Sequence, residues 1–286
     1  GLGSNTIDGE AGIDVITYKS IGSAVTVNLG ANSATGWGGA DSITGIENII
    51  GPDIASNLSG DGAANSIVGG SANDTIEGGA GSDTIDGGSG DDLVLGGSGA
   101  DSLIGGIGTN TLSYSDASTA VSINLSSGTA NGGAFGNDTF TGFINVIGST
   151  AGDSIIGDGA NNSIAGGDGA DTITGGLGSN TIDGEAGIDV ITYENMTSGI
   201  TVNLDLNSAS GTGIADSITG IENVIGSTAD DLIVGNTGNN SILAGDGNDT
   251  VGGGAGDNTL DGGAGVNTLT YETLASSVFV DLSAAS

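Results

Sequence analysis

The sequence predicts an all-β solenoid, in which short strands and tight turns alternate at constant length. Long stretches divide without a gap into nine-residue units such as GGAGSDTID, which begins at Gly78, and GGSGADSLI, which begins at Gly96. Gly occupies 60 of the 286 positions. One apolar residue per unit cannot form a helix stripe, but it can form a three-residue strand with one inward side chain. Such coils bury their aliphatic column only by stacking on neighbouring coils.

The strand half of each unit is marked by an aliphatic residue at its eighth position. These residues are Ile7, Ile16, Leu58, Ile67, Ile76, Ile85, Val94, Leu103, Leu112, Ile155, Ile164, Ile173, Ile182, Ile191, Ile233, Ile242, Val251, Leu260 and Leu269. The six residues before each of them are rich in Gly and end mostly in Asp or Asn, which supply the left-handed conformations of tight turns. We therefore expect one strand and one turn in each unit.

Runs of units alternate with spacers, each opened by one of the four tyrosines. Residues 1–17 end one run, 51–113, 148–192 and 226–270 form three more, 18–50, 114–147 and 193–225 are spacers, and 271–286 starts another spacer. A spacer holds an alternating strand such as Val25–Leu29 or Val278–Leu282, a Gly/Ser/Ala-rich stretch and a second strand. We expect the spacers to continue the stack as irregular coils, with the Gly-rich stretches as bulged loops and each Tyr covering the aliphatic column.

Composition excludes several function classes. The formal net charge is −34, and Lys19 is the single basic residue. Such a chain repels phosphate backbones and anionic membranes, so we expect no nucleic-acid partner, and no apolar run is long enough for a membrane span. His, Cys and Arg are absent, which removes catalytic triads, thiolate nucleophiles and zinc sites. Carboxylate pairs could serve a glycosidase, but carboxylates that stack coil after coil are better explained as cation ligands. We expect no enzyme.

The units match a known pattern. GGxGxDxUx, with U a large aliphatic residue, is the glycine-rich nonapeptide of RTX (repeats-in-toxin) proteins, and the unit from Gly78 fits it at every defined position. The spacers, with segments such as VTVNL and DSITGIENVIG, also resemble those of long secreted RTX proteins. The resemblance implies a right-handed parallel β-roll with two nonapeptides per coil, Ca²⁺ between the turns, and export to the cell exterior by type I secretion.

The resemblance assigns the calcium ligands to the sixth position of the unit. The matching carboxylates are Asp14, Asp74, Asp83, Asp92, Asp101, Asp153, Asp171, Asp189, Asp231 and Asp249. Ca²⁺ takes six to eight oxygens, and Gly-rich turns expose backbone carbonyls beside these carboxylates. The sixth position is Ser56 or Asn elsewhere, and Asp and Asn alternate from Asp153 to Asp189. With two units per coil, one edge of that run would be an Asp column that binds calcium, and the other an Asn column held by amide hydrogen bonds.

Other interpretations of the acidic residues remain open. Asp and Asn before Thr-Ile are also turn formers that tolerate left-handed conformations, so an isolated unit needs no metal. Acids at the ninth position, such as Asp86, fit a solvated face. Glu47 and Glu222 in the spacers fit either a ligand or a surface role.

The predicted function is structural: a calcium-stiffened extracellular rod in a surface layer, an adhesin stalk or a matrix filament. The alternatives are the secretion and folding module of an exported hydrolase, or an RTX array that binds a ligand such as ice. An ice-binding face needs identical residues on every coil, whereas the second position of the unit varies. The sequence starts within a run and shows no polar cap, so we expect it to continue or self-associate end to end.

Overall fold

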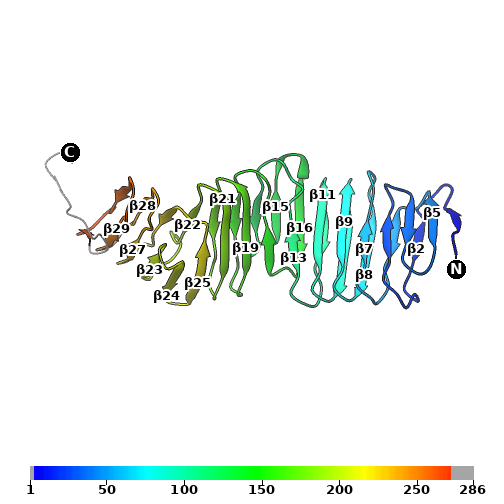
Figure 1. Cartoon of the computed structure of the whole chain (residues 1–286), viewed down its shortest axis with the longest axis horizontal. Coiled ribbons are helices and arrows are strands. Elements are labelled where there is room, and N and C mark those ends of the chain that lie inside the picture. The colour runs from blue at the N-terminus through cyan, green and yellow to red at the C-terminus, as the bar shows by residue number, and fades with distance from the viewer. Residues whose placement is uncertain (1–2, 272–286) are drawn as a thin grey trace.

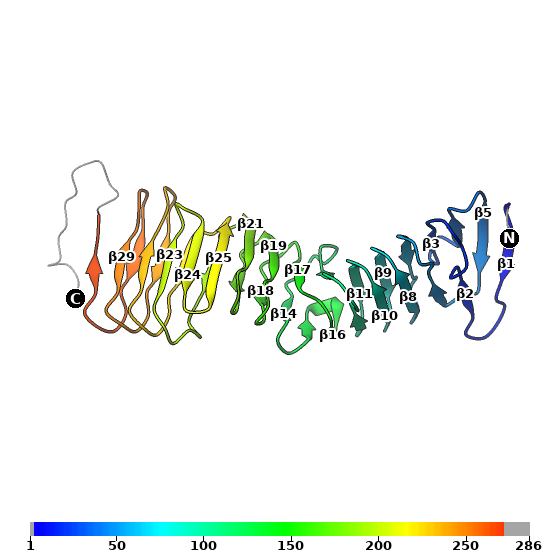
Figure 2. The same ribbon diagram turned by 90° about the horizontal axis from the view of Figure 1, so that it is seen from below.

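The computed structural model describes residues 3–271 and shows a rod built from two β-sheets. Strands run across the long axis, and the rod is elongated in both views (Figures 1 and 2). The strand predicted at Val278–Leu282 lies outside the described residues. Within those residues, sheet A has 17 strands and sheet B has 14. The all-β solenoid predicted from the sequence is confirmed.

The strands follow one another along the chain and mostly alternate between the sheets. Sheet A contains β1 (Thr6–Asp8), β3 (Thr26–Asn28), β4 (Ser33–Thr35), β5 (Ala40–Thr44), β7 (Asn57–Ser59), β9 (Thr75–Ala80), β11 (Leu93–Ser98), β13 (Thr111–Ser113), β17 (Asn145–Ile147), β19 (Ser163–Gly169), β21 (Thr181–Gly187), β23 (Ile200–Asn203), β24 (Ser208–Gly211), β25 (Ile214–Thr219), β27 (Leu232–Val234), β29 (Thr250–Gly252) and β31 (Thr268–Leu269). Sheet B contains β2 (Val15–Thr17), β6 (Asn48–Ile50), β8 (Ser66–Ser71), β10 (Thr84–Ser89), β12 (Ser102–Ile104), β14 (Ser122–Asn124), β15 (Thr129–Asn131), β16 (Asn137–Thr141), β18 (Ser154–Ile156), β20 (Thr172–Thr174), β22 (Val190–Thr192), β26 (Asn223–Ile225), β28 (Ser241–Leu243) and β30 (Thr259–Asp261). A single 3₁₀ turn, η1 (Gly133–Phe135), interrupts the described strands.

Within the runs, each coil holds two nonapeptides. In sheet B, β10 pairs in parallel with β8 and β12, so that Ile85 lies beside Ile67 and Leu103. In sheet A, Val94 lies beside Ile76 and Leu112 in the same way. Both neighbours are two units away along the chain. The coil repeat of two nonapeptides that the resemblance implies is therefore present in the structure.

The eighth-position residues form the core. Ile67, Ile76 and Ile85 are completely buried, and all the others except three are buried as well. The exceptions lie in the end coils of the described rod, where Ile7 and Leu260 are half-buried and Leu269 is exposed. Residues on either side of the eighth position point outward, because side chains alternate along a strand.

The spacers continue the stack, but the Gly/Ser/Ala-rich stretches form strands rather than the bulged loops expected from the sequence. In the first spacer, β4 pairs antiparallel with both β3 and β5. Then β5 stacks on β1 and β3 on β7, both in parallel. The second spacer builds the same three-stranded meander from β14, β15 and β16, and the third from β23, β24 and β25. Each spacer therefore places three strands in one sheet and one strand in the other, two more than an ordinary coil needs.

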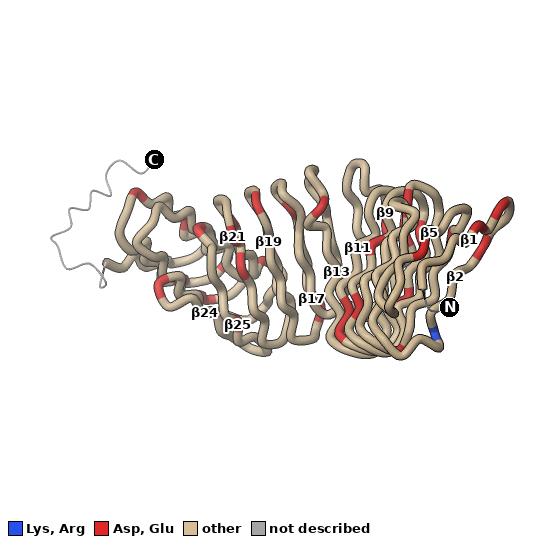
Figure 3. Tube along the Cα trace, turned by 45° about the vertical axis from the view of Figure 1, so that its right-hand side comes forward, with Lys and Arg blue, Asp and Glu red and all other residues tan. Residues whose placement is uncertain are grey.

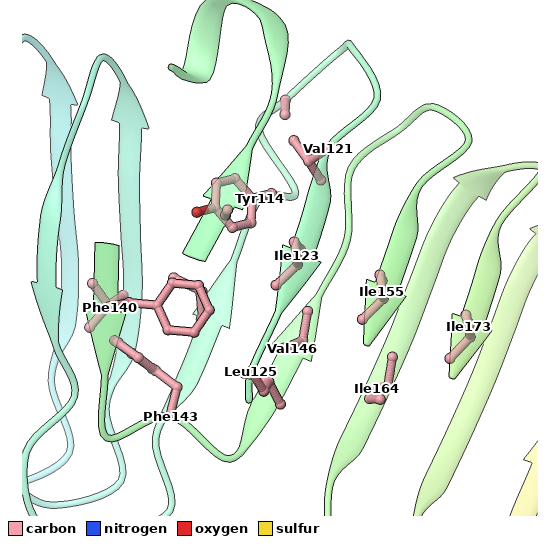
Figure 4. Close-up of a cluster of buried hydrophobic side chains, with 14 of the residues drawn as sticks. Tyr114, Val121, Ile123, Leu125, Phe140, Phe143, Val146, Ile155, Ile164 and Ile173 are labelled. Carbon is pink, nitrogen blue, oxygen red and sulfur yellow. The ribbon is translucent and has the colours of Figure 1, made fainter. Parts of the chain in front are cut away.

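The tyrosines fill the interior opposite these extra strands. Tyr18 follows β2 in sheet B, while the extra strands of its spacer lie in sheet A. Tyr114 follows β13 in sheet A, opposite extra strands in sheet B, and Tyr193 repeats the first arrangement. All three are buried. Tyr114 belongs to the same buried cluster as Phe140, which stacks on Leu103 of the preceding run (Figure 4). The Tyr114 ring lies edge-on to Phe135, with ring centroids 6.3 Å apart. Each ring thus packs against the aliphatic column, as the sequence predicts.

Candidate calcium sites

The sixth-position side chains form hydrogen-bonded columns along the two edges of the rod. The backbone N–H of Asp74 donates to Oδ1 of Asp92, one coil further on, at 2.8 Å. Asp83 and Asp101 are joined in the same way on the other edge, also at 2.8 Å. Of the ten predicted ligands, nine accept such a bond from the preceding coil, and Asp14 is the exception. The structure therefore stacks alternate units on one edge, as expected.

The second carboxylate oxygen has no partner in eight of these residues. The eight are Asp14, Asp74, Asp83, Asp92, Asp101, Asp171, Asp189 and Asp249, and in each the Oδ2 atom is buried without a hydrogen bond. A buried carboxylate oxygen without a partner is costly, and ion binding removes that cost. Burial raises the pKa of Asp74, Asp83 and Asp171 to about 6, against the hydrogen bond that each accepts from the preceding coil. Neighbouring carboxylates raise it further.

Asp153 and Asp231 differ from the other eight because their carboxylates are satisfied within their own turn. Oδ2 of Asp153 accepts the N–H of Ser149 at 2.5 Å, and Oδ1 accepts the Ser149 hydroxyl at 2.7 Å. Ser227 makes the same two bonds to Asp231, at 2.6 and 2.7 Å. Neither carboxylate needs a further partner.

The backbone at the second position of the unit separates the two groups. All eight units with an unpartnered Oδ2 have a positive φ at that position; examples are 104° at Gly79 and 107° at Gly167. We call this an open turn. In a closed turn the second residue has no positive φ, and its N–H donates to the sixth side chain of its own unit. The closed turns are those of Asp153, Asp231, Asn65, Asn162 and Asn240.

In several open turns the second-position N–H points instead to the ninth residue of the preceding unit. Gly88 donates to Oδ1 of Asp86 at 3.1 Å, and Glu185 donates to Oδ1 of Asp183 at 3.0 Å. Ninth-position acids, expected on a solvated face, thus also fix the open turn.

Stacking explains why Gly fills the second position of the open turns other than those of Glu10 and Glu185. A Cβ atom at Gly79 would collide with the backbone carbonyl of Asp61, which holds the same second position in the unit one coil earlier. Gly167 and Ser149 have the same relation in the next run. Every closed turn belongs to the first coil of a run, where the preceding coil is part of a spacer. There the second residue carries a side chain: Pro52, Asp61, Ser149, Asp158, Ser227 and Asn236. In the open turns it is Gly, except at Glu10 and Glu185, which adopt the positive φ despite their side chains.

The Asn residues form their own column in the run from 148 to 192, as expected. The N–H of Asn162 donates to Oδ1 of Asn180 at 2.9 Å, and the amide of Asn162 donates to the carbonyl of Ile144 at 2.8 Å. An amide supplies both a donor and an acceptor, so this edge is satisfied by the protein alone.

Five spacer acids continue these columns, of which the sequence singled out only Glu47 and Glu222, as either ligands or surface residues. Asp138 and Asp216 accept the N–H of Asp101 and Asn180, at 2.9 and 3.0 Å, and Asp41 accepts that of Asn5. Their signal was present in the sequence: each stands two residues before an inward apolar residue, as in the repeats. Glu47 and Glu222 occupy the corresponding place on the other edge.

Tyrosine hydroxyls satisfy two of these spacer carboxylates. The Tyr114 hydroxyl donates to Oδ2 of Asp138 at 2.7 Å, and that of Tyr193 to Oδ2 of Asp216 at 3.1 Å. The Tyr18 hydroxyl is buried without a hydrogen bond among the described residues. At the end of two runs, a tyrosine hydroxyl thus donates to the second carboxylate oxygen, which has no partner in the eight open-turn aspartates.

The donor set of the open turns fits calcium. Among residues 3–271 no group of three or more acidic side chains is close enough to hold a metal, so any ion must take most of its ligands from the backbone. Ca²⁺ accepts carbonyl oxygens alongside one or two carboxylates in tolerant geometry. Asp and Glu recur along the whole rod, with one basic residue near the N-terminal end (Figure 3). Since the chain has one basic residue, it cannot balance these charges with its own side chains.

Comparison with known proteins identifies the family. The model of the RTX calcium-binding nonapeptide repeat, in four copies, matches residues 1–17, 59–94, 78–112, 147–191, 216–251, 225–260 and 234–269, which together cover more than half of the chain. The chain belongs to the RTX calcium-binding nonapeptide repeat family, whose repeats bind calcium and typically occur in exported proteins. Among curated proteins, no match to the chain is found. No helix in residues 3–271 is long and apolar enough to cross a membrane.

Proposed function

We propose that this protein is an extracellular structural rod, stiffened by calcium, in a surface layer, an adhesin stalk or a matrix filament. The observation that carries the proposal is the unbroken stack. Sheet A passes through runs and spacers without losing a strand pairing, from β1 to β31, while unpartnered carboxylates recur along both edges. A load-bearing rod needs that continuity, and it needs no reacting group.

In this proposal calcium binds at the open turns whose sixth residue is Asp. The eight aspartates with an unpartnered Oδ2 hold the ion, with backbone carbonyls of the Gly-rich turns completing its shell. The ion supplies positive charge to buried carboxylates that otherwise repel one another. Asp153 and Asp231, also predicted as ligands, lie in closed turns, and their serine partners let the first coil of a run fold without metal.

We propose that the spacers at 18–50, 114–147 and 193–225 are braces between the calcium-binding runs. Antiparallel pairing and a buried Tyr hold each meander. In the second and third spacers the hydroxyl of that residue, Tyr114 or Tyr193, also donates a hydrogen bond to a carboxylate. The rod therefore keeps rigid joints that do not depend on every calcium site being filled.

Export by type I secretion and end-to-end assembly belong to the same proposal. A chain that folds only with calcium stays unfolded where calcium is scarce, which suits export through a narrow channel. Among the described residues β1 pairs with β5 alone, so one edge of sheet A offers unpaired backbone groups to a further strand. That strand comes from more of the same polypeptide or from a second copy.

An array that binds ice is the weaker candidate. The outward residue before each inward one varies along sheet B, as in Val15, Asn48, Ser66 and Thr84. A surface that binds an ordered lattice needs one repeated residue there.

Small-angle X-ray scattering, with calcium and with chelator, tests the rod. The 17 strands of sheet A, at about 4.8 Å spacing, give a length of roughly 75 Å and a radius of gyration of about 25 Å in calcium. The unfolded chain of 286 residues has a radius of gyration of roughly 60 Å. A compact globule in calcium, or the same profile in both conditions, would contradict the proposal.

A further inference from the structure

The last turn of two runs lies against a spacer glutamate. The N–H of Asp189 donates to Oε2 of Glu222 at 2.9 Å, and the N–H groups of Glu222 and Asn223 donate to the Asp189 carbonyl at 3.2 and 2.9 Å. Glu222 thus occupies the place that the next sixth-position side chain takes within a run. Two carboxylates from different coils meet at this junction.

One of these carboxylates lacks a partner. Asp189 is 0% exposed, and its Oδ2 atom has no hydrogen bond. Burial raises the pKa of Asp189, and the charges of Glu222 and Asp183 raise it further, against the N–H bond from Asp171. The chain has no basic residue after Lys19, so no side chain can neutralise the pair. A buried unpartnered oxygen beside a second carboxylate is a site for a cation.

The chain contains its own comparison. Asp14 and Glu47 repeat the arrangement at the end of the first run: the N–H of Asp14 donates to Oε2 of Glu47 at 2.8 Å, and Oδ2 of Asp14 has no partner. At the third junction of this kind, between the run 51–113 and the spacer 114–147, Asn110 and Ile144 stand in the places of the two acids.

The backbone of that third junction is nevertheless the same. The N–H groups of Ile144 and Asn145 both donate to the Asn110 carbonyl at 3.1 Å. The amide of Asn110 donates to the carbonyl of Gly142 at 3.0 Å, so it needs no ion. Two carboxylates are therefore not needed to join a run to a spacer, and they are present or absent together.

We propose that Asp189 and Glu222 together bind a calcium ion at the junction of run and spacer, that Asp14 and Glu47 bind a second, and that the junction of Asn110 with Ile144 binds none. Calcium is the cation of choice because carboxylate and carbonyl oxygens are its preferred ligands, and the neighbouring turn is an open turn. The inference rests on the proposed calcium function and adds a ligand from outside the nonapeptide.

Equilibrium dialysis of the full chain against radioactive calcium, at a saturating concentration, tests the proposal. In Glu222→Gln the amide oxygen still accepts the Asp189 N–H, so the junction keeps its hydrogen bond and loses only its charge. We expect this variant to bind one calcium fewer than the unmodified protein, Glu47→Gln one fewer, and the double variant two fewer. Glu194→Gln, in the same spacer but exposed, is the matched control and should bind as many as the unmodified protein.

The possible results separate this inference from the wider proposal. If Glu222→Gln and Glu47→Gln bind as many calcium ions as the unmodified protein, the junction sites are wrong while the open-turn sites stand. If the unmodified protein binds no calcium, the proposed function itself fails. Circular dichroism in calcium confirms that each variant keeps its strands, and because the two junctions lie in separate runs, each variant checks the other.

Discussion

The Tyr114 hydroxyl offers a sharp test of how the runs end. It donates to Oδ2 of Asp138 at 2.7 Å, and both residues are at most 2% exposed. Tyr114→Phe leaves the ring in place and removes the donor, so a buried carboxylate oxygen loses a charge-assisted bond. Such losses cost about 1.5–3 kcal/mol. Taking about 2 kcal/mol, the equilibrium constant for local opening should rise about thirtyfold.

Hydrogen exchange, read by mass spectrometry on the calcium-loaded protein, measures that local opening directly. A stacked-repeat protein does not unfold in one step, so a local readout is better than a global melting curve. Peptides that cover β13 to β16 should lose about thirtyfold in protection in Tyr114→Phe. Tyr18→Phe is the matched control, because the Tyr18 hydroxyl has no hydrogen bond among the described residues, and protection around it should stay within about twofold.

Two results would refute the reasoning. Protection in Tyr114→Phe within about twofold of the unmodified protein would mean that the Tyr114 hydroxyl contributes nothing to the joint. Equal losses in Tyr114→Phe and Tyr18→Phe would mean that the loss does not come from the bond to Asp138, because the Tyr18 hydroxyl has no hydrogen bond among the described residues.

Three further changes test the stack, the core and the charge. Gly79→Ala should destabilise its coil in the calcium-loaded rod by about 2–4 kcal/mol, because φ is 104° there and the new Cβ meets the Asp61 carbonyl. Gly62→Ala, with open space around it, should cost under about 0.5 kcal/mol, both measured by hydrogen exchange of peptides that cover the substituted coil. Ile85→Ala should cost about 2–5 kcal/mol by the same assay, and equal costs for Ile85→Ala and the exposed Leu177→Ala would contradict the single-column core. Burial raises the pKa of Asp74, Asp83, Asp138 and Asp171 to about 6. Protonation of these carboxylates therefore stabilises the folded protein fully below the ordinary aspartate pKa, and this stabilisation is lost as the pH rises through 6. Calcium-free protein, unfolded at pH 7.5, should therefore gain strand signal in circular dichroism at pH 5. The same or a weaker strand signal at pH 5 would show that these carboxylates are not buried as described.

The nonapeptide part of the fold could be predicted because its signal repeats. One aliphatic residue at a fixed place, as in Ile76 and Ile85, specifies the inward side chain of each strand, and the repeat length specifies which coils stack. The spacers gave a weaker signal. Ser33–Thr35 has too little alternation to be read as a strand, and it becomes one because β3 and β5 pair with it on both sides. Tertiary pairing decided that element.

The sequence could predict which positions hold candidate calcium ligands, but not which of those carboxylates lack a hydrogen-bond partner. Asp153 and Asp171 look equivalent in the sequence, yet the first is satisfied by Ser149 and the second is not. The signal that separates them is the residue at the second position, which is Ser149 in one unit and Gly167 in the other. Its meaning depends on a collision between coils and on a side-chain conformation, and neither follows from composition or spacing.

The central claim, that aspartates in open turns bind calcium and aspartates in closed turns do not, is tested most directly by counting bound calcium in two variants. Asp171→Asn and Asp153→Asn make the same chemical change one coil apart on the same edge, with Asp171 in an open turn and Asp153 in a closed one. We expect equilibrium dialysis to show that Asp171→Asn has lost at least one calcium ion and that Asp153→Asn has kept them all. Equal losses in the two variants, or no loss in Asp171→Asn, would contradict the claim.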